Sequence, residues 1–144
     1  MAFAWAQQSF GYIRLAHIHL NLLGFITLAI VGTMHNLLPT VLNAPLSSPR
    51  LARVVMWLFP LGLAVLITGF MNSSVMIEMA GGGVLVLSAL LYASNLFTTW
   101  LRSSHQGSAA SDHLLVATFF LVLTLVLGVL VAANNIATDR KSVV

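Results

Sequence analysis

Two histidines separated by one residue lie near the start of a long apolar run, in the stretch "LAHIHLNLLGF" at positions 15–25. An ionisable side chain is costly inside a membrane, so its default interpretation is functional. Imidazole is the commonest metal ligand in proteins and a standard axial ligand of haem iron. His17 and His19 are therefore candidate ligands of a metal or of haem iron, with hydrogen bonding between helices as the open alternative.

A helical wheel separates these two histidines. At about 100° per residue, five residues share a sector of roughly 80°, and they are His17, Asn21, Gly24, Gly32 and His35. His19 points about 160° away from His17, toward an apolar face. The wheel predicts two environments on one helix, with Asn21 and Gly24 beside His17. The glycines favour close helix packing, and room for a flat cofactor is the alternative.

Two further histidines are predicted at the opposite end of the spans. His35 lies near the end of the first apolar run, and His113 begins the last one. These two could bind a metal, share a proton or lie at the membrane interface. A rise of 1.5 Å per residue places His17 about 27 Å from His35, so one site cannot use both residues.

The composition predicts an integral membrane protein. Of the 144 residues, 59% are hydrophobic and 6% are charged, whereas a soluble domain carries about 25% charged residues. The formal net charge of +3 rests on few residues, which is too little for a nucleic-acid surface. Because the chain has no cysteine, disulfides, iron–sulfur clusters, thiolate ligands and c-type haem attachment are excluded.

Four stretches reach the length of about 20 apolar residues that a transmembrane helix needs, and they cover residues 12–38, 51–71, 80–101 and 113–133. Their short connections favour antiparallel neighbours. We therefore expect one all-α domain over residues 1–144, a four-transmembrane-helix up-and-down bundle. Pro39 is expected to end the first helix and Asp112 to cap the fourth. No cleaved signal peptide is expected, because the N-terminus lacks a basic segment before an apolar core.

The stretch "AHIHLNLLGFITLAIVGTMHNLLP" resembles the tenth transmembrane helix of the catalytic subunit of haem–copper oxidases, including the cbb3-type enzymes and nitric oxide reductases. NnrS-type haem and copper membrane proteins are similar there. The shared pattern is His-x-His, two spaced glycines, an aromatic or histidine position and a proline, here His17, His19, Gly24, Gly32, His35 and Pro39. The resemblance implies that His17 ligates a high-spin haem and His19 a low-spin haem.

The resemblance covers one helix of four, and the chain departs from the family elsewhere. It has no adjacent His-His pair for the family's copper site, and residues 51–71 and 80–101 contain no histidine. The resemblance therefore implies haem b ligation, in electron transfer or within a larger redox complex. We do not expect this chain alone to reduce oxygen or nitric oxide. Bacterial inner-membrane localisation is expected.

A low-spin haem needs a second axial ligand opposite His19. At that depth we expect the other helices to offer Thr68, Ser88 and Thr124, which are not haem ligands of this kind. A second copy of the chain, or another subunit of a redox complex, is therefore the expected partner within the lipid membrane.

Two other functions stay open. Copper binding is possible, because His17 and His19 with Met71, Met76 and Met79 would suit Cu(I). A structural or assembly subunit without a cofactor is the third hypothesis. His35 and His113 are weaker candidates for a second metal site.

Overall fold

The computed structural model describes residues 2–104 and 109–142, and it is helical almost throughout this part of the chain. In chain order the elements are α1 (Ala2–His19), the π-helix η1 (Leu20–Thr27), α2 (Leu28–Leu42), α3 (Pro49–Met71), α4 (Val75–Leu101) and α5 (Ala109–Ser142). Within these residues, four helical stretches are long and apolar enough to cross a membrane: Phe10–Leu42, Pro49–Met71, Val75–Leu101 and Ala109–Asn134. The predicted all-α, four-span fold is confirmed.

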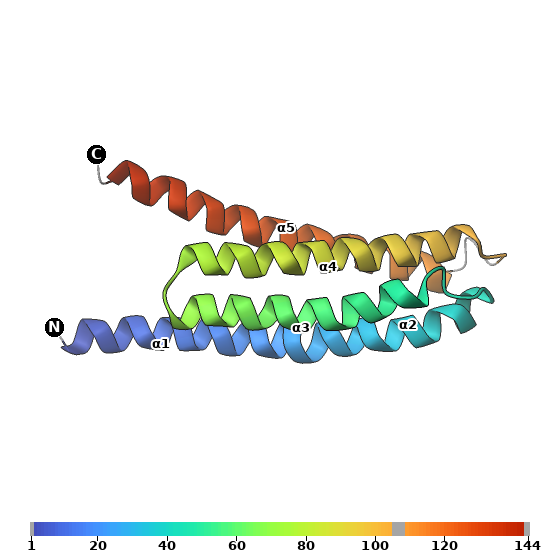
Figure 1. Ribbon diagram of the computed structural model, residues 1–144, viewed down its shortest axis with the longest axis horizontal. Helices are drawn as coiled ribbons and strands as arrows, with labels where there is room; N and C mark the ends of the chain where they lie inside the picture. Colours follow the sequence, from blue (N-terminus) through green and yellow to red (C-terminus); the bar gives the residue numbers. More distant parts are fainter. Residues whose placement is uncertain (1, 105–108, 143–144) are drawn as a thin grey trace.

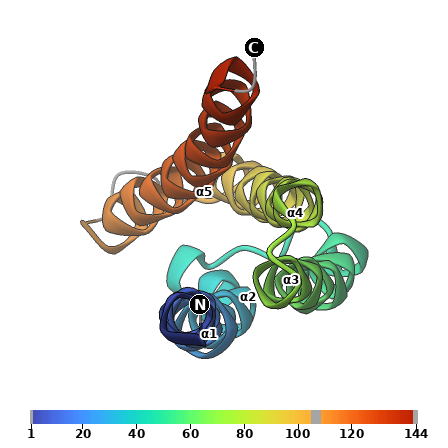
Figure 2. The same ribbon diagram turned by 90° about the vertical axis from the view of Figure 1, so that its left-hand side faces the viewer.

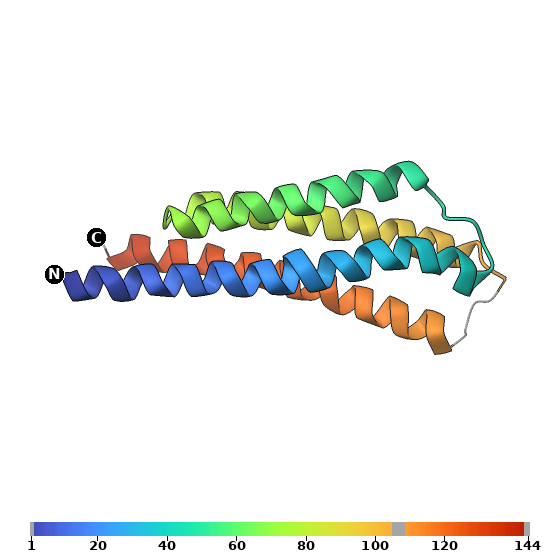
Figure 3. The same ribbon diagram turned by 90° about the horizontal axis from the view of Figure 1, so that it is seen from below.

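The helices run up and down. Both ends of the chain and the short α3–α4 connection lie at one end of the bundle, and the α2–α3 connection lies at the other (Figures 1 and 3). We call the first of these the hairpin end and the second the loop end. In the end-on view, α3 lies beside α1 and α2, and α4 lies between α3 and α5 (Figure 2). Helix α5 diverges from α4 toward its C-terminus (Figure 1), and its described residues do not contact α1.

Two helix boundaries differ from those expected. The first span continues through Pro39 and ends at Leu42, so the expected stop at Pro39 is wrong. Membrane helices tolerate an internal proline when neighbouring groups compensate for the lost backbone bond. The helix ends where Asn43 adopts a left-handed conformation with φ of 46°. Asp112 lies in the first turn of α5 and does not precede it, so its expected capping position is also wrong.

Helices α3 and α4 form the most extensive antiparallel pair, and small residues allow their backbones to approach. A Cβ atom added at Gly69 would lie 2.6 Å from the Glu78 backbone nitrogen, and one at Gly62 would lie 2.9 Å from Val84 Cγ1. A Cβ at Gly81 would overlap the backbone of Leu66. Close helix packing, the interpretation favoured above for the glycines of the first span, is thus also what these three glycines of α3 and α4 allow.

The π-helical segment η1 interrupts the first span directly after His19. The Leu28 amide donates to the Leu23 carbonyl, five residues earlier. The Thr27 hydroxyl donates to the Leu22 carbonyl at 2.8 Å, also five residues earlier. Because each such turn takes up one residue more than an α-helical turn, η1 changes the rotation between α1 and α2.

Candidate functional site

His19 faces the bundle at the end of α1. Its ring packs on Phe70 of α3, with ring centroids 4.9 Å apart and planes inclined by 53°. Its Nδ1 lies 2.8 Å from the Leu15 carbonyl oxygen. Since a carbonyl can only accept, Nδ1 carries a proton, and in the neutral imidazole Nε2 then keeps its lone pair. Metal-ligating histidines are usually held in this way, by a hydrogen bond from the nitrogen that does not bind the metal.

The surroundings of His19 come from the hairpin end of α3 and α4. Glu78 lies in the first turn of α4 and interacts electrostatically with His19. Glu78 also packs over Gly69 of α3. His19 is therefore level with the end of α3. The expected neighbour Ser88 lies deeper, because its hydroxyl donates to the Val55 carbonyl at 3.5 Å.

His17 lies on the exposed side of α1, as does Asn21. The Asn21 side-chain nitrogen donates to the His17 carbonyl at 2.8 Å and lies 3.2 Å from His17 Nε2. The Nε2 lone pair of His17 is thus engaged by Asn21. The predicted divergence of the two histidines is confirmed, because His17 points out of the bundle while His19 packs on α3.

The predicted shared face of His17 and His35 is wrong. The His35 ring meets Tyr92 of α4 edge-on, with centroids 5.3 Å apart, whereas His17 is exposed. The reason is η1: one extra residue in a turn reduces the effective His19–His35 separation to 15 helical residues, which leaves about 60° between them. His19 and His35 therefore both face the bundle, and His17 lies roughly 100° away from His35.

The two glycines of the histidine motif contact α3. A Cβ atom at Gly24 would lie 2.9 Å from Leu63 Cδ2, and one at Gly32 would lie 3.3 Å from Met56 Cε. Gly24 is therefore turned toward the bundle and away from the exposed face of His17. A flat cofactor beside Gly24 would require the Leu63 side chain to move.

His35 and His113 have different surroundings, and each ring bonds a carbonyl of its own helix. His35 Nδ1 lies 2.9 Å from the Val31 carbonyl, and its Nε2 is buried without a hydrogen-bond partner. His113 is exposed, with Nδ1 2.6 Å from the Ala109 carbonyl. Among the described residues, no group of three or more histidine, cysteine or acidic side chains is gathered for a metal ion. Their role in a second metal site stays a prediction.

Sequence reasoning missed the aromatic and acidic neighbours of the two inward histidines. Phe70 covers His19, Tyr92 covers His35, and a side-chain hydrogen bond joins Tyr92 to Thr118 of α5. The third span was expected to begin at residue 80, but α4 begins at Val75 and includes Glu78 in its first turn. The sequence signal that could have identified these neighbours is the register of antiparallel helices. That register places each of these residues at the same height in the bundle as its histidine.

The arrangement offers one imidazole inside the bundle, at His19, whose Nδ1 is held by a carbonyl, and one outside, at His17, whose Nε2 is engaged by Asn21. The His19 Nε2 lone pair suits an axial ligand of haem iron. Haem needs only axial donors and apolar surroundings. Haem binding therefore does not depend on a cluster of three or more metal-binding side chains, and the described residues contain no such cluster.

Comparison with known proteins gives the family. The family model described as "Cytochrome C and Quinol oxidase polypeptide I" matches residues 1–142. No curated protein and no solved structure matches the chain. Four apolar helices and this family together make the protein an integral membrane protein. Since the family match spans nearly the whole chain, the protein belongs to the haem–copper oxidase subunit I family.

Proposed function

We propose that this chain is a small membrane haem b protein that acts in electron transfer or as a subunit of a larger redox complex. His19 and His17 would each provide an axial ligand, on different faces of α1. The observation that carries the proposal is the His19 geometry, in which the 2.8 Å bond from Nδ1 to the Leu15 carbonyl leaves Nε2 of the neutral imidazole available to iron. Family membership supports haem as the ligand.

A bound haem would supply a one-electron redox centre. The task of the chain is then to bind it, to orient it and to exclude water. The Leu15 carbonyl fixes the tautomer of His19, and Phe70 limits the rotation of its ring. Both effects favour a defined iron–imidazole orientation.

The second axial ligand would come from a partner within the lipid membrane. Near His19 the chain itself places Phe70 and Glu78, and neither is the neutral imidazole or thioether that a low-spin b-type haem requires. We propose a second copy of the chain, related by a twofold axis, or another subunit of a redox complex. The exposed position of His17 is consistent with a ligand that serves such a partner.

The same proposal places the protein in the bacterial inner membrane. Respiratory electron transfer takes place there in bacteria, and the family match points to that process.

The test is haem binding by the purified protein. The chain is expressed with ample haem supply and purified in detergent, and its absorption spectrum, EPR spectrum and haem content per chain are measured. We expect a Soret band, loss of the low-spin signal in His19→Ala and loss of the high-spin signal in His17→Ala. Added imidazole should restore the low-spin signal of His19→Ala, which separates ligand loss from misfolding.

Thr33→Ala is the matched control. Thr33 is an exposed polar residue of the same span, and its hydroxyl donates to the Ala29 carbonyl. This variant should keep the full haem content. A colourless protein despite ample haem would overturn the proposal. One haem per two chains together with a dimeric mass would identify the second copy as the partner.

Copper binding is the second candidate function. It is supported by the position of His19 along the bundle. His19 is level with the hairpin end, and three methionines belong to the helix ends there: Met71, Met76 and Met79. Imidazole and thioether ligands suit Cu(I). Metal analysis that finds copper without haem would select this function. A protein that binds neither cofactor but associates stably with a partner would be an assembly subunit.

A further inference from the structure

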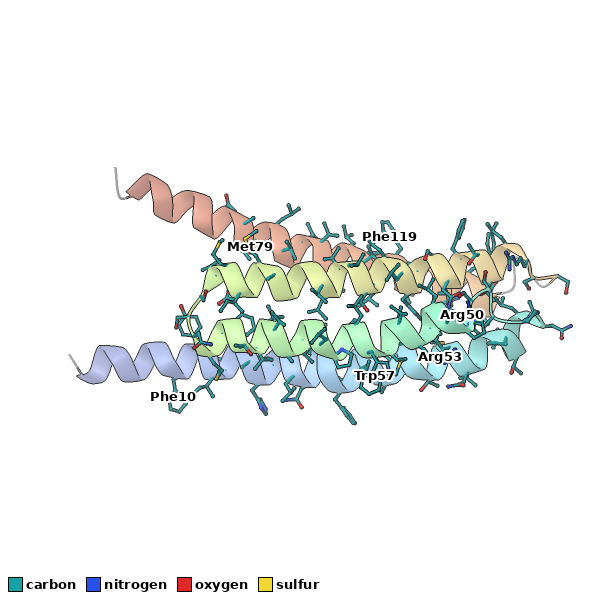
Figure 4. All side chains as sticks on the ribbon, in the orientation of Figure 1. Phe10, Arg50, Arg53, Trp57, Met79 and Phe119 are labelled. Atoms are coloured by element: carbon teal, nitrogen blue, oxygen red, sulfur yellow. The ribbon has the colours of Figure 1, made fainter. Side chains whose placement is uncertain are left out.

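An exposed group of two arginines and a tryptophan lies at the start of α3. We call Arg50, Arg53 and Trp57 the arginine–tryptophan face; all three are exposed, and Trp57 has 80% of its surface exposed. Their spacing of three and four residues places them on one side of the helix. Figure 4 shows all three along the half of α3 that is nearer the loop end.

The two arginines have no acidic neighbour in the described structure. No ion pair or hydrogen bond joins the side chain of Arg50 or Arg53 to another described residue. The acidic residue nearest this end, Asp112, belongs to α5, whose described residues make no contact with α3. Glu78 lies at the hairpin end. Two guanidinium groups therefore stand unneutralised on one helix face.

The start of α3 is held firmly by α4. The buried Asn95 side chain accepts from the Ser48 amide at 2.9 Å and donates to the Ser48 carbonyl at 3.1 Å. The Ser48 hydroxyl accepts from the Leu51 amide and caps the helix. The arginine–tryptophan face therefore projects from a fixed helix end, which reduces the entropy lost on binding a ligand.

The depth of the three residues matches the edge of a membrane. Arg50 is the second residue of α3, and Trp57 lies seven residues further along, which is about 10 Å deeper at 1.5 Å per residue. The headgroup layer on each side of a bilayer is roughly 5–8 Å thick. With the start of α3 at the membrane surface, the arginines would reach the phosphate level and the Trp57 indole the boundary with the acyl chains, where tryptophan is enriched.

We propose that the arginine–tryptophan face binds the phosphate group of an anionic phospholipid. The guanidinium forks of Arg50 and Arg53 match phosphate oxygens in geometry and charge. The Trp57 indole covers the glycerol and upper acyl region and offers its N–H to an ester or phosphate oxygen. An acidic protein would satisfy the arginines too, but it would leave an exposed tryptophan below them without an apolar contact.

The test compares lipids retained by the full chain. The protein is purified from membranes that contain phosphatidylglycerol, and native mass spectrometry counts the bound lipids. We expect retained phosphatidylglycerol, a loss of about fivefold in Arg53→Gln, the size expected for one basic residue near an anionic surface, and a greater loss in the Arg50→Gln and Arg53→Gln double variant. Trp57→Leu should also lower retention.

Arg102→Gln is the matched control, because Arg102 is an exposed arginine at the same membrane face but outside the arginine–tryptophan face. It should retain the lipid. In a second measurement, phosphatidylglycerol should raise the unfolding temperature of the unaltered chain, while phosphatidylcholine and inorganic phosphate should not. Equal losses in Arg53→Gln and Arg102→Gln, or equal retention of the two lipids by the unaltered chain, would overturn the proposal.

Discussion

Three of the histidines share one local geometry. In His19, His35 and His113 the ring Nδ1 lies within hydrogen-bond distance of the carbonyl four residues earlier. In the neutral ring this bond leaves Nε2 with its lone pair in each case. The three residues therefore differ in their surroundings, and only His19 combines a packed ring with the position that the family motif gives to a haem ligand. His17 differs in that Asn21 engages its Nε2.

Single glycines provide a direct residue-scale prediction about packing. A Cβ at Gly81 would overlap the Leu66 backbone, while one at Gly83 would meet nothing within 4 Å. Gly81→Ala should lower the free energy of unfolding by about 1–3 kcal/mol, because backbone atoms cannot yield as a flexible side chain can. Gly83→Ala should be neutral or stabilising, by up to about 1 kcal/mol from helix propensity. Circular dichroism during unfolding in detergent measures both, and equal effects would contradict the α3–α4 packing.

At the scale of elements, η1 decides which histidine faces the bundle. Its hydrogen bonds span five residues and begin directly after His19. In a regular α-helix, His17 and not His19 would share a face with His35. π-Helical turns are rare and occur frequently at functional sites, which agrees with a position beside the candidate haem ligands.

Engineered cysteines can test this orientation, because the chain has no cysteine of its own. The pair His19→Cys and Phe70→Cys should form a disulfide under mild oxidation faster than the pair His17→Cys and Phe70→Cys. The physical reason is that the His19 ring contacts the Phe70 ring, whereas His17 points outward. Gel mobility with and without reductant measures both pairs.

Removal of one residue from η1 adds a control to the same experiment. Phe25 is 74% exposed and belongs to η1. Its deletion should turn the segment into a regular α-helix and keep α1 and α2 in their present orientation, so the 19–70 disulfide should still form. If deletion abolished that disulfide, the account of η1 as a one-residue insertion would be wrong.

At the scale of the whole molecule, the bundle is open on one side. Helix α5 packs on α4 and touches α2, but its described residues do not contact α1 (Figure 2). The first span, Phe10–Leu42, has 33 residues and is about 50 Å long, so it exceeds a hydrocarbon core of roughly 30 Å. His19, level with the end of α3, therefore lies toward one membrane face.

Thiol labelling can test the sidedness of the whole bundle. Phe10 and Met76, 77% and 73% exposed, lie toward the hairpin end, while Pro45 lies in the connection at the loop end. A membrane-impermeant reagent added to sealed, oriented vesicles should label Phe10→Cys and Met76→Cys from the same side. Pro45→Cys should be labelled only from the other side. Labelling of Phe10→Cys and Pro45→Cys from one side would contradict the up-and-down order.

Much of the fold was predictable from sequence. Span number, approximate span positions and the all-α class follow from hydrophobic length, because a helix in lipid satisfies its own backbone hydrogen bonds. The motif of His17 and His19 and their divergence also follow from sequence, since residues two positions apart in a helix point in nearly opposite directions. The end of the first helix was misplaced because Pro39 is tolerated within it.

The tertiary structure alone decided which way each face points and what it meets. The wheel assumed a uniform 100° per residue, and the π-helical turn in η1 broke that assumption. Helix α3 then determined the rest, since Leu63 lies against Gly24 and Phe70 against His19. Such contacts join residues more than 35 positions apart, and no local pattern encodes them. The sequence by itself determined that a helix with two histidines crosses the membrane, and packing decided that His19 faces inward.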